Sequence, residues 1–367
     1  MREVSADRLQ KYRVRLLGRL ALAPALATLL RGRRALLVTT PTVERLYGES
    51  LRQALLASDQ RVEHLVLPCT ESTKSLALVQ ELCARAQREG LERTGVLIAL
   101  GGGVLSDVVT VAASLIRRGI EHVRVPTTLI GQIDAGIGVK GAVNFGGRKS
   151  YLGCFYAPSE VLIVPELLRT LPAPLLSEGL SEILKMALVR DAGLFDALEE
   201  HGPTLLAGCF GEPGGAGERV LWRAIELMLE ELEPNLFEDR SWERLVDFGH
   251  TFSPVLEAEL GFTLGHGFAV GVDMAICAAI SRKRGLLEEE ELIRILRLME
   301  ALALPVWHDA LSSPVFTRAI AEAAVHRGGR PNVILPRGIG SAICEPDPGV
   351  FDDDAFAFAY ARLARSP

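Results

Sequence analysis

The feature that most constrains this chain is the alternation of short apolar runs with helical segments in its first half. Four runs rich in aliphatic residues predict buried strands: Ala35–Thr39, His64–Leu67, Val96–Leu100 and His122–Val125. Between them, Thr42–Ala57 and Thr73–Glu89 show helical periodicity. Strands that alternate with helices pair in parallel, because each crossover helix returns the chain to the same edge of the sheet. We therefore expect an α/β domain with a parallel sheet.

From about Pro172 the pattern changes to successive helices. Helical periodicity extends over six segments: Ser177–Glu200, Arg219–Glu231, His250–Leu260, Gly267–Arg284, Glu288–Leu302 and Phe316–Val325. Gly208–Gly217 is a Gly/Pro-rich loop, and Pro331–Pro336 predicts one late strand. The sequence thus predicts an α/β domain over residues 1–170 and a mostly α-helical domain over residues 171–367.

Composition narrows the class of protein. With 49% hydrophobic and 23% charged residues, the chain can bury a sizeable core. A net charge of −6 without a Lys/Arg-rich run argues against nucleic-acid binding. No apolar stretch reaches about 18 residues, so we expect no membrane span. The N-terminal segment lacks the apolar core of a signal peptide, and the six cysteines form no CxxC pair, which favours free thiols in the cytoplasm.

A glycine turn follows the third predicted strand. The three glycines are Gly101, Gly102 and Gly103, and Asp107 lies in the helix that they begin. Glycines let the backbone approach a ligand closely, and a helix N-terminus offers free N–H groups to a pyrophosphate. The pattern is not GxGxxG, so a plain tight turn remains an equal alternative. The next strand ends at Thr127 and Thr128, where α/β sheets bind ligands.

The next segment combines glycines with an unusual set of polar side chains. They are Asp134, Lys140, Asn144, Arg148 and Lys149. Lysine supplies a mobile point charge and arginine a planar fork, which together suit a phosphate group. This composition predicts a phosphate-binding loop, with solvated loop charges as the alternative.

Three residues of the second half form a candidate metal site: Glu182, His250 and His266. One carboxylate and two imidazoles suit Zn²⁺ or a similar ion and leave coordination positions open for substrate hydroxyl groups. We expect both histidines at helix starts flanked by glycine. Their spacing matches no compact motif such as HExxH, so capping or core histidines remain the alternative.

Taken together, these motifs resemble the 3-dehydroquinate synthase superfamily. GGGVLSD, PTTLIGQIDAGIGVK, NFGGRK, GLSEILK, FGHTF and LGHG occur in the order seen in that family, over roughly residues 35–340. The resemblance implies an N-terminal domain that binds NAD, a helical C-terminal domain and a homodimer.

The resemblance also implies roles for individual residues. NAD contacts are Glu71, Lys74, Gly101, Gly102, Gly103, Asp107, Thr127, Thr128 and Lys149. The ligands of a zinc or cobalt ion are Glu182, His250 and His266. Residues around the substrate are Asp134, Lys140, Asn144, Lys149 and Lys185, and Arg118 matches an arginine that contacts phosphate across the dimer.

Departures from the family pattern indicate a branch. Pro254 stands where 3-dehydroquinate synthases have a second histidine, Phe145 replaces a polar ring, and Ser150 replaces an asparagine. These changes resemble the sedoheptulose 7-phosphate cyclases. Asp247 and His326 resemble the 2-epi-5-epi-valiolone synthases among them, whereas Glu233 leaves the 2-epi-valiolone synthases open.

We therefore expect a cytoplasmic enzyme whose partner is a small sugar phosphate. The resemblance implies that it converts sedoheptulose 7-phosphate to 2-epi-5-epi-valiolone with phosphate release. The steps would be transient oxidation by NAD, elimination, re-reduction and intramolecular aldol cyclisation. The alternatives are a 2-epi-valiolone synthase, a 3-dehydroquinate synthase, an iron-type polyol dehydrogenase and a non-catalytic descendant.

Overall fold

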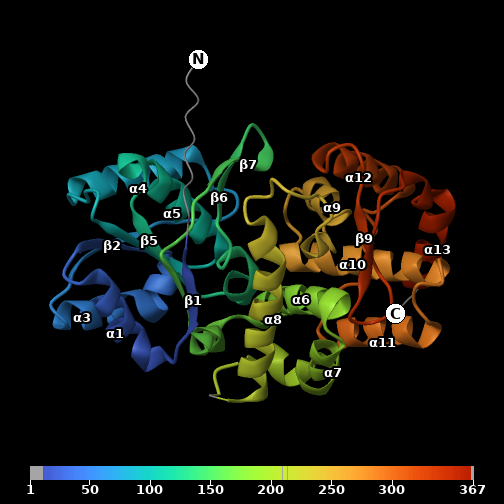
Figure 1. The fold of residues 1–367 in the computed structure, drawn as a ribbon, viewed down its shortest axis with the longest axis horizontal. Coiled ribbons are helices and arrows are strands. Elements are labelled where there is room, and N and C mark those ends of the chain that lie inside the picture. Colours follow the sequence, from blue (N-terminus) through green and yellow to red (C-terminus); the bar gives the residue numbers. More distant parts are fainter. Residues whose placement is uncertain (1–10, 209, 213, 365–367) are drawn as a thin grey trace. The chain divides into compact units, whose positions relative to one another are not determined.

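The computed structural model describes residues 11–208, 210–212 and 214–364, which form two compact units (Figure 1). The described residues within Met1–Thr127 and Ala135–Pro165 form unit 1, and those within Thr128–Asp134 and Glu166–Pro367 form unit 2. The division into one domain over residues 1–170 and another over residues 171–367 stays a prediction. The segment interpreted above as lacking a signal peptide lies partly outside the described residues, as does Cys209 of the Gly/Pro-rich loop.

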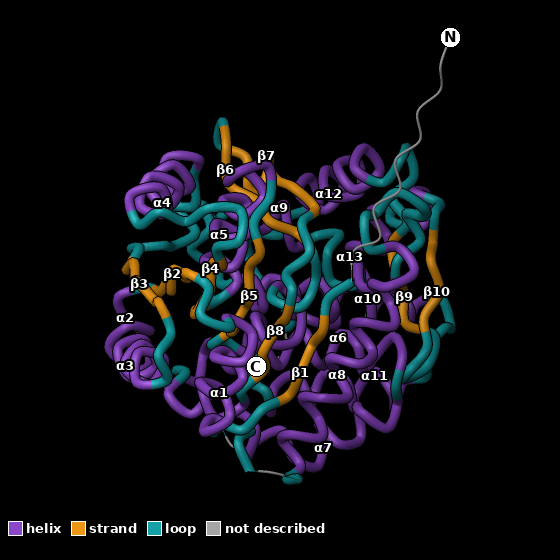
Figure 2. Tube along the Cα trace, turned by 60° about the vertical axis from the view of Figure 1, so that its left-hand side comes forward, coloured by secondary structure: helices purple, strands orange, loops and turns teal. Residues whose placement is uncertain are grey.

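Unit 1 contains a six-stranded sheet in the order β3-β2-β4-β5-β8-β1 (Figure 2). All neighbouring strands are parallel, which confirms the predicted α/β class. The four predicted strands are present, and β1 and β8 are strands that were not predicted. The bounds are β1 (Arg13–Leu16), β2 (Arg34–Thr39), β3 (Arg61–Val66), β4 (Val96–Gly101), β5 (Glu121–Pro126) and β8 (Glu160–Ile163).

Helices complete this α/β unit. They are α1 (Arg19–Leu30), α2 (Pro41–Val43), α3 (Glu49–Ala57), α4 (Leu76–Arg88) and α5 (Gly103–Leu115). The predicted helix Thr42–Ala57 contains a π-helical turn, Glu44–Gly48, between α2 and α3. Apolar side chains of α4 and α5, such as Leu82 and Val109, form one core with strand residues such as Leu97.

The strand order explains the position of the glycine turn. The chain runs from β2 outward to β3 and then returns to β4 on the other side of β2, so the direction of winding reverses between β2 and β4. Open α/β sheets bind ligands at the carboxyl ends of strands beside such a reversal. Gly101 ends β4 at this point, and α5 begins two residues later.

The glycine-rich segment predicted as a loop is instead mostly regular. A π-helical turn, Gly131–Ala135, precedes the antiparallel hairpin of β6 (Lys140–Phe145) and β7 (Arg148–Phe155). The hairpin turns at Gly146 and Gly147, whose φ angles of 59° and 77° suit a two-residue turn of the primed type. The charged residues hid the strand pattern, because both faces of this hairpin carry polar side chains.

Arg124 of β5 holds the start of this hairpin in unit 1. The side chain is fully buried, and its guanidinium donates to the carbonyls of Gly138 (2.7 Å) and Lys140 (2.9 Å) and to Oγ1 of Thr110 (2.7 Å). Burial lowers the pKa of Arg124 to about 10, so the group remains charged at neutral pH.

Unit 2 is mostly helical, as predicted. Its helices are α6 (Ala173–Arg190), α7 (Ala192–Leu206), α8 (Ala216–Leu232), α9 (Ser253–Glu259), α10 (His266–Lys283), α11 (Glu289–Ala301), α12 (Ser313–His326) and α13 (Asp353–Leu363). The late strand β9 (Val333–Pro336) pairs with β10 (Ala342–Glu345), which was not predicted. α6 and α10 are buried on nearly every side, and they pack against each other. Within the described residues, no helix is both long and apolar enough to cross a membrane.

Two predicted helix bounds in unit 2 were wrong. Ser177–Glu200 is divided between α6 and α7, because Asp191 has an extended backbone and caps α7 by accepting a hydrogen bond from the N–H of Leu194. His250 lies in a turn that precedes α9, rather than at the start of a helix.

Arg124→Met should lower the free energy of unfolding by about 3 kcal/mol or more. The substitution leaves several buried oxygens without a donor, at about 1–3 kcal/mol each. Urea unfolding measures the change, and Arg88→Met on exposed α4 surface is the control, expected to change stability by less than about 0.5 kcal/mol. Equal stability of the two variants would contradict the role given to Arg124.

Candidate active site and metal centre

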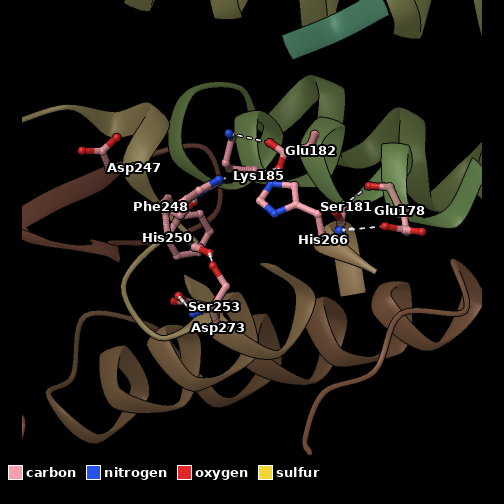
Figure 3. Close-up of polar contacts among 12 residues, drawn as sticks. Glu178, Ser181, Glu182, Lys185, Asp247, Phe248, His250, Ser253, His266 and Asp273 are labelled. Carbon is pink, nitrogen blue, oxygen red and sulfur yellow. Dashed lines mark hydrogen bonds and ion pairs between the residues drawn. The ribbon is translucent and has the colours of Figure 1, made fainter. Parts of the chain in front are cut away.

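A buried ion pair on α6 is the centre of the candidate site (Figure 3). Glu182 is fully buried and Lys185 is 2% exposed, and Oε2 of Glu182 lies 2.5 Å from Nζ of Lys185. The two residues are one helical turn apart, so they share a face of α6. Neither oxygen of Glu182 accepts a hydrogen bond of ordinary geometry from the described residues. A buried carboxylate without ordinary hydrogen bonds needs a further cation or hydrogen-bond donor.

His250 approaches Glu182 from the turn before α9. Its Nδ1 lies 3.0 Å from the carbonyl of Phe248, which fixes the ring so that Nε2 faces Glu182 at 4.0 Å. The turn is held by Asp273 of α10, which accepts the backbone N–H groups of residues 251, 252 and 253 at 2.5–2.9 Å. The position of His250 therefore depends on a buried carboxylate 23 residues further along the chain.

His266 begins α10 and lies between two glycines that serve close packing. A Cβ on Gly267 would lie 2.3 Å from the carbonyl oxygen of Glu178 on α6, so only glycine lets the two helices approach this closely. Nδ1 of His266 lies 2.9 Å from Oε1 of Glu257, and its Nε2 lies 3.5 Å from Oε1 of Glu182. Glu257 thus orients the ring as a carboxylate does in many metal sites.

The donor set fits a divalent metal ion. Ligand atoms of Glu182, His250 and His266 all lie within 4.8 Å of one another. Donors that share a tetrahedral zinc ion about 2.0–2.2 Å away are separated by about 3.3–3.6 Å. The 3.5 Å between His266 and Glu182 matches this separation, and the 4.0 Å between His250 and Glu182 is slightly longer. Both histidines direct Nε2 toward the buried carboxylate of Glu182, which pairs with Lys185 but accepts no hydrogen bond of ordinary geometry from the described residues, so a metal cation fits this set of donors.

The charges of this cluster are strongly coupled. Burial alone would raise the pKa of Glu182, but Lys185 and the histidines outweigh burial and hold it well below its ordinary value. Burial, and then Lys185, lower the pKa of His250 to about 4. Burial would also lower the pKa of His266, but Glu182 and Glu257 raise it to about 9. Glu182 and then Asp134 raise the pKa of Lys185 against the effect of its burial.

A second polar cluster lies in unit 1, at the predicted NAD contacts. Lys74, 4% exposed, pairs with Asp107 of α5 at 2.6 Å. Asn144 of β6 donates to both the backbone carbonyl (2.9 Å) and Oε1 (3.0 Å) of Glu71. Burial raises the pKa of Asp107 more than Lys74 lowers it. The structure thus brings together four residues that the sequence assigned to cofactor or substrate.

The glycine turn fits a bound pyrophosphate. A Cβ on Gly101 would lie 2.6 Å from the side chain of Leu105, and one on Gly103 would lie 2.9 Å from that of Ala135. α5 begins without a side-chain cap, so its first N–H groups suit an anion. Thr127 donates its N–H to the carbonyl of Gly101 at 3.0 Å, which places it beside the turn. Thr128 belongs to unit 2, where Oγ1 accepts the N–H of Gly131 at 3.1 Å.

Of the other predicted residues, Lys140, Lys149, Arg118 and His326 lie outside these two clusters, whereas Asp134 and Asp247 act electrostatically on Lys185. Lys140 and Lys149 are exposed on the β6–β7 hairpin. Arg118 is exposed with a left-handed φ of 63°, and it lines a surface pocket with Glu92, Arg93, Thr94 and Arg117. His326 is exposed at the end of α12. Asp247 lies three residues before His250 and pairs with Arg244 at 2.7 Å.

Three supporting residues of unit 2 were not predicted: Glu257, Asp273 and Arg327. Asp273 had a signal in the sequence, since it is the one charged residue within the apolar run Gly267–Ile280 and therefore needs buried donors. Glu257 had none, because it stands in an ordinary helical pattern, and Arg327 had none, because it lies in a short polar turn after α12.

Comparison with known proteins identifies the family. The model of the 3-dehydroquinate synthase N-terminal domain matches residues 64–178, and that of the C-terminal domain matches residues 179–324. A 3-dehydroquinate synthase of Zymomonas mobilis subsp. mobilis is 33% identical over 341 residues, which cover 91% of this chain and 88% of the relative. The chain belongs to the 3-dehydroquinate synthase family.

Within that family, the chain has higher identity to one group. A 2-epi-5-epi-valiolone synthase of Streptomyces hygroscopicus subsp. jinggangensis (strain 5008) is 43% identical over 372 residues, covering 100% of this chain and 90% of the relative. The solved structure of ValA, the 2-epi-5-epi-valiolone synthase from strain 5008 with NAD⁺ and Zn²⁺ bound, matches with a TM-score of 0.92 and 44% identity. That match covers 98% of this chain and 99% of ValA. The predicted resemblance to the 2-epi-5-epi-valiolone synthases is confirmed.

The metal-free protein should lose stability as the pH rises from about 6.5 to about 9. His266 has a raised pKa of about 9 in the folded protein against about 6.5 when unfolded. The contribution of protonated His266 to the free energy of unfolding is therefore complete below the pKa of the unfolded state. It is lost as the pH rises through the pKa of the folded state. The melting temperature of chelator-treated protein, measured across this pH range, shows the effect. His266→Gln should make the melting temperature nearly independent of pH in this range. A wild-type curve as flat as that of the variant would contradict the assignment.

Proposed function

We propose that this chain converts sedoheptulose 7-phosphate into 2-epi-5-epi-valiolone and inorganic phosphate, with NAD⁺ and a divalent metal ion, zinc or cobalt, as cofactors. The observation that carries the proposal is the buried carboxylate of Glu182, which faces Nε2 of both His250 and His266 and lies against Lys185. The 43% identity to a 2-epi-5-epi-valiolone synthase, against 33% to a 3-dehydroquinate synthase, supports this substrate over that of the wider family.

The cofactors supply the redox and Lewis-acid chemistry. When bound, NAD⁺ takes up a hydride and returns it within one turnover, and the metal ion stabilises negative charge on substrate oxygens. Glu182, His250 and His266 would hold the metal. The residues that would hold NAD are Glu71, Lys74, Gly101, Gly102, Gly103, Asp107, Thr127, Thr128 and Lys149.

Lys185 has a role that its surroundings define. Glu182 and Asp134 raise its pKa, so the ammonium group stays charged at neutral pH although it is buried. A charged donor in a site of low dielectric interacts strongly with an oxygen on which negative charge develops. We propose that Lys185 donates a hydrogen bond to a substrate oxygen during oxidation and elimination. Asp134, Asn144 and Asp247 would form hydrogen bonds with the substrate hydroxyl groups.

The cations Lys140, Lys149 and Arg118 would bind the phosphate. In this proposal they hold a phosphate oxygen near the C–H bond that is broken, and the phosphate accepts that proton as it leaves. Well-aligned intramolecular proton transfers of this kind lower a barrier by about 7–11 kcal/mol. His326 would contact the substrate in the ring-closing step.

We also propose a homodimer in which Arg118 reaches the partner's substrate. The left-handed backbone at Arg117 and Arg118 supports this, since such strain is retained where a side chain must be presented in a fixed direction. A cytoplasmic location is supported by the free thiols of the described cysteines Cys69, Cys83, Cys154, Cys277 and Cys344. The net charge of −6 supports a small-molecule partner rather than a nucleic acid.

The purified protein with NAD⁺ and Zn²⁺ or Co²⁺ should release phosphate from sedoheptulose 7-phosphate without net formation of NADH. 3-Deoxy-arabino-heptulosonate 7-phosphate is the control substrate. Release from the control alone would mean a 3-dehydroquinate synthase, and steady accumulation of NADH would mean a polyol dehydrogenase.

Lys149→Ala should lower kcat at least about a hundredfold, because the phosphate loses a positioning charge. NAD⁺ binding, measured by fluorescence titration, should be largely retained, because the other eight residues of the proposed NAD site are unchanged. Lys11→Ala, at an exposed lysine outside both clusters, is the matched control and should leave kcat unchanged. Unchanged turnover of Lys149→Ala would remove this residue from the site.

A further inference from the structure

Arg327 is a buried arginine that joins three segments of unit 2. It follows α12 directly and is 8% exposed. Its Nη1 donates to the carbonyl of Pro331 at 2.7 Å and lies 3.2 Å from that of Asn332, so the side chain closes its own loop before β9. These contacts fix the guanidinium plane relative to the strand.

The same guanidinium also forms hydrogen bonds with the turn that contains His250. Nη2 donates to the carbonyl of His250 at 2.9 Å, and Nη1 lies 3.2 Å from Oγ1 of Thr251. On another side of this turn, Asp273 accepts three consecutive backbone N–H groups, beginning with that of Thr251. The turn, which Figure 3 shows between His250 and Asp273, is therefore held by a buried anion and a buried cation.

Arg327 further reaches a carboxylate at the start of the turn. Its Nε lies 3.7 Å from Oδ2 of Asp247, while Arg244 holds Oδ1 of the same group at 2.7 Å. Asp247 also contributes to the raised pKa of Lys185, so the carboxylate acts electrostatically on the buried ion pair. Arg244 forms an ion pair with Asp247. Arg327 contacts both the carboxylate of Asp247 and the backbone carbonyl of His250.

We propose that Arg327 is a positioning residue that fixes the carboxylate of Asp247 relative to the metal ligand His250 and thereby determines which epimer the ring closure forms. The inference rests on the proposed function. Epimers differ in the face of the carbonyl that is attacked, and a tenfold preference corresponds to only about 1.4 kcal/mol. One carboxylate held in place is enough to supply such a preference.

A planar guanidinium is essential to this arrangement. Nη1 donates to the loop before β9, Nη2 donates to the His250 carbonyl, and Nε lies 3.7 Å from the carboxylate of Asp247. Lysine has a single point charge on a flexible stem and cannot serve all three. Arg327→Lys therefore preserves charge and approximate volume while it releases the geometric link.

The test measures the cyclitol product by NMR and zinc affinity by chelator competition, for wild type and Arg327→Lys. We expect a second epimer to rise to at least about a tenth of the product, and zinc affinity to fall about 10–100-fold. Arg318→Lys, at an exposed arginine of α12, is the matched control and should behave as wild type. Arg327→Gln, which keeps a buried donor but no charge toward Asp247, gives the same readouts if Arg327→Lys cannot be purified.

A double-mutant cycle with Asp247→Asn separates positioning from general destabilisation. If Arg327 acts through Asp247, the combined variant gives the same epimer ratio as Asp247→Asn alone. A single wild-type epimer from both Arg327 variants, with wild-type zinc affinity, overturns the inference. A wild-type enzyme that releases no phosphate from sedoheptulose 7-phosphate instead overturns the proposed function itself.

Discussion

The burial of the Glu182 carboxylate is the constraint on which the rest of unit 2 depends. An ionised carboxylate without water is stable only when cations or donors surround it. Lys185 supplies one charge from the next turn of α6, and two imidazoles face the remaining side. The lowered pKa of Glu182 and the raised pKa of Lys185 are two consequences of this one arrangement.

Helix packing around this charge requires particular residues far from the ion pair. Gly267 lets the start of α10 approach α6 closely enough for His266 to face Glu182. Glu257 and the carbonyl of Phe248 occupy Nδ1 of the two histidines, so that both present Nε2 to the same point. Asp273 and Arg327 fix the turn that carries His250. The geometry of the candidate metal site thus depends on the core of unit 2 as much as on the three candidate ligands.

Much of this could be predicted from the sequence. The strand and helix periods predict the α/β class, and the motif order predicts Glu182, His250 and His266 as metal ligands, which the structure brings within 4.8 Å of one another. The β6–β7 hairpin could not be predicted, because its charges conceal the alternation that marks a strand. The contact of Arg327 with His250 joins residues 77 positions apart, and no local pattern encodes it. Long-range polar contacts of this kind depend on tertiary packing, which local sequence patterns do not predict.

The most direct test of the account is a crystal structure of the protein with NAD⁺ and Zn²⁺, with anomalous diffraction recorded at the zinc absorption edge. The account predicts one strong anomalous peak per chain in this part of unit 2. That ion should be bound by Glu182 and by Nε2 of His250 and His266 at about 2.0–2.2 Å. A zinc ion held by other residues, or the absence of a peak at this triad under saturating zinc, would contradict it.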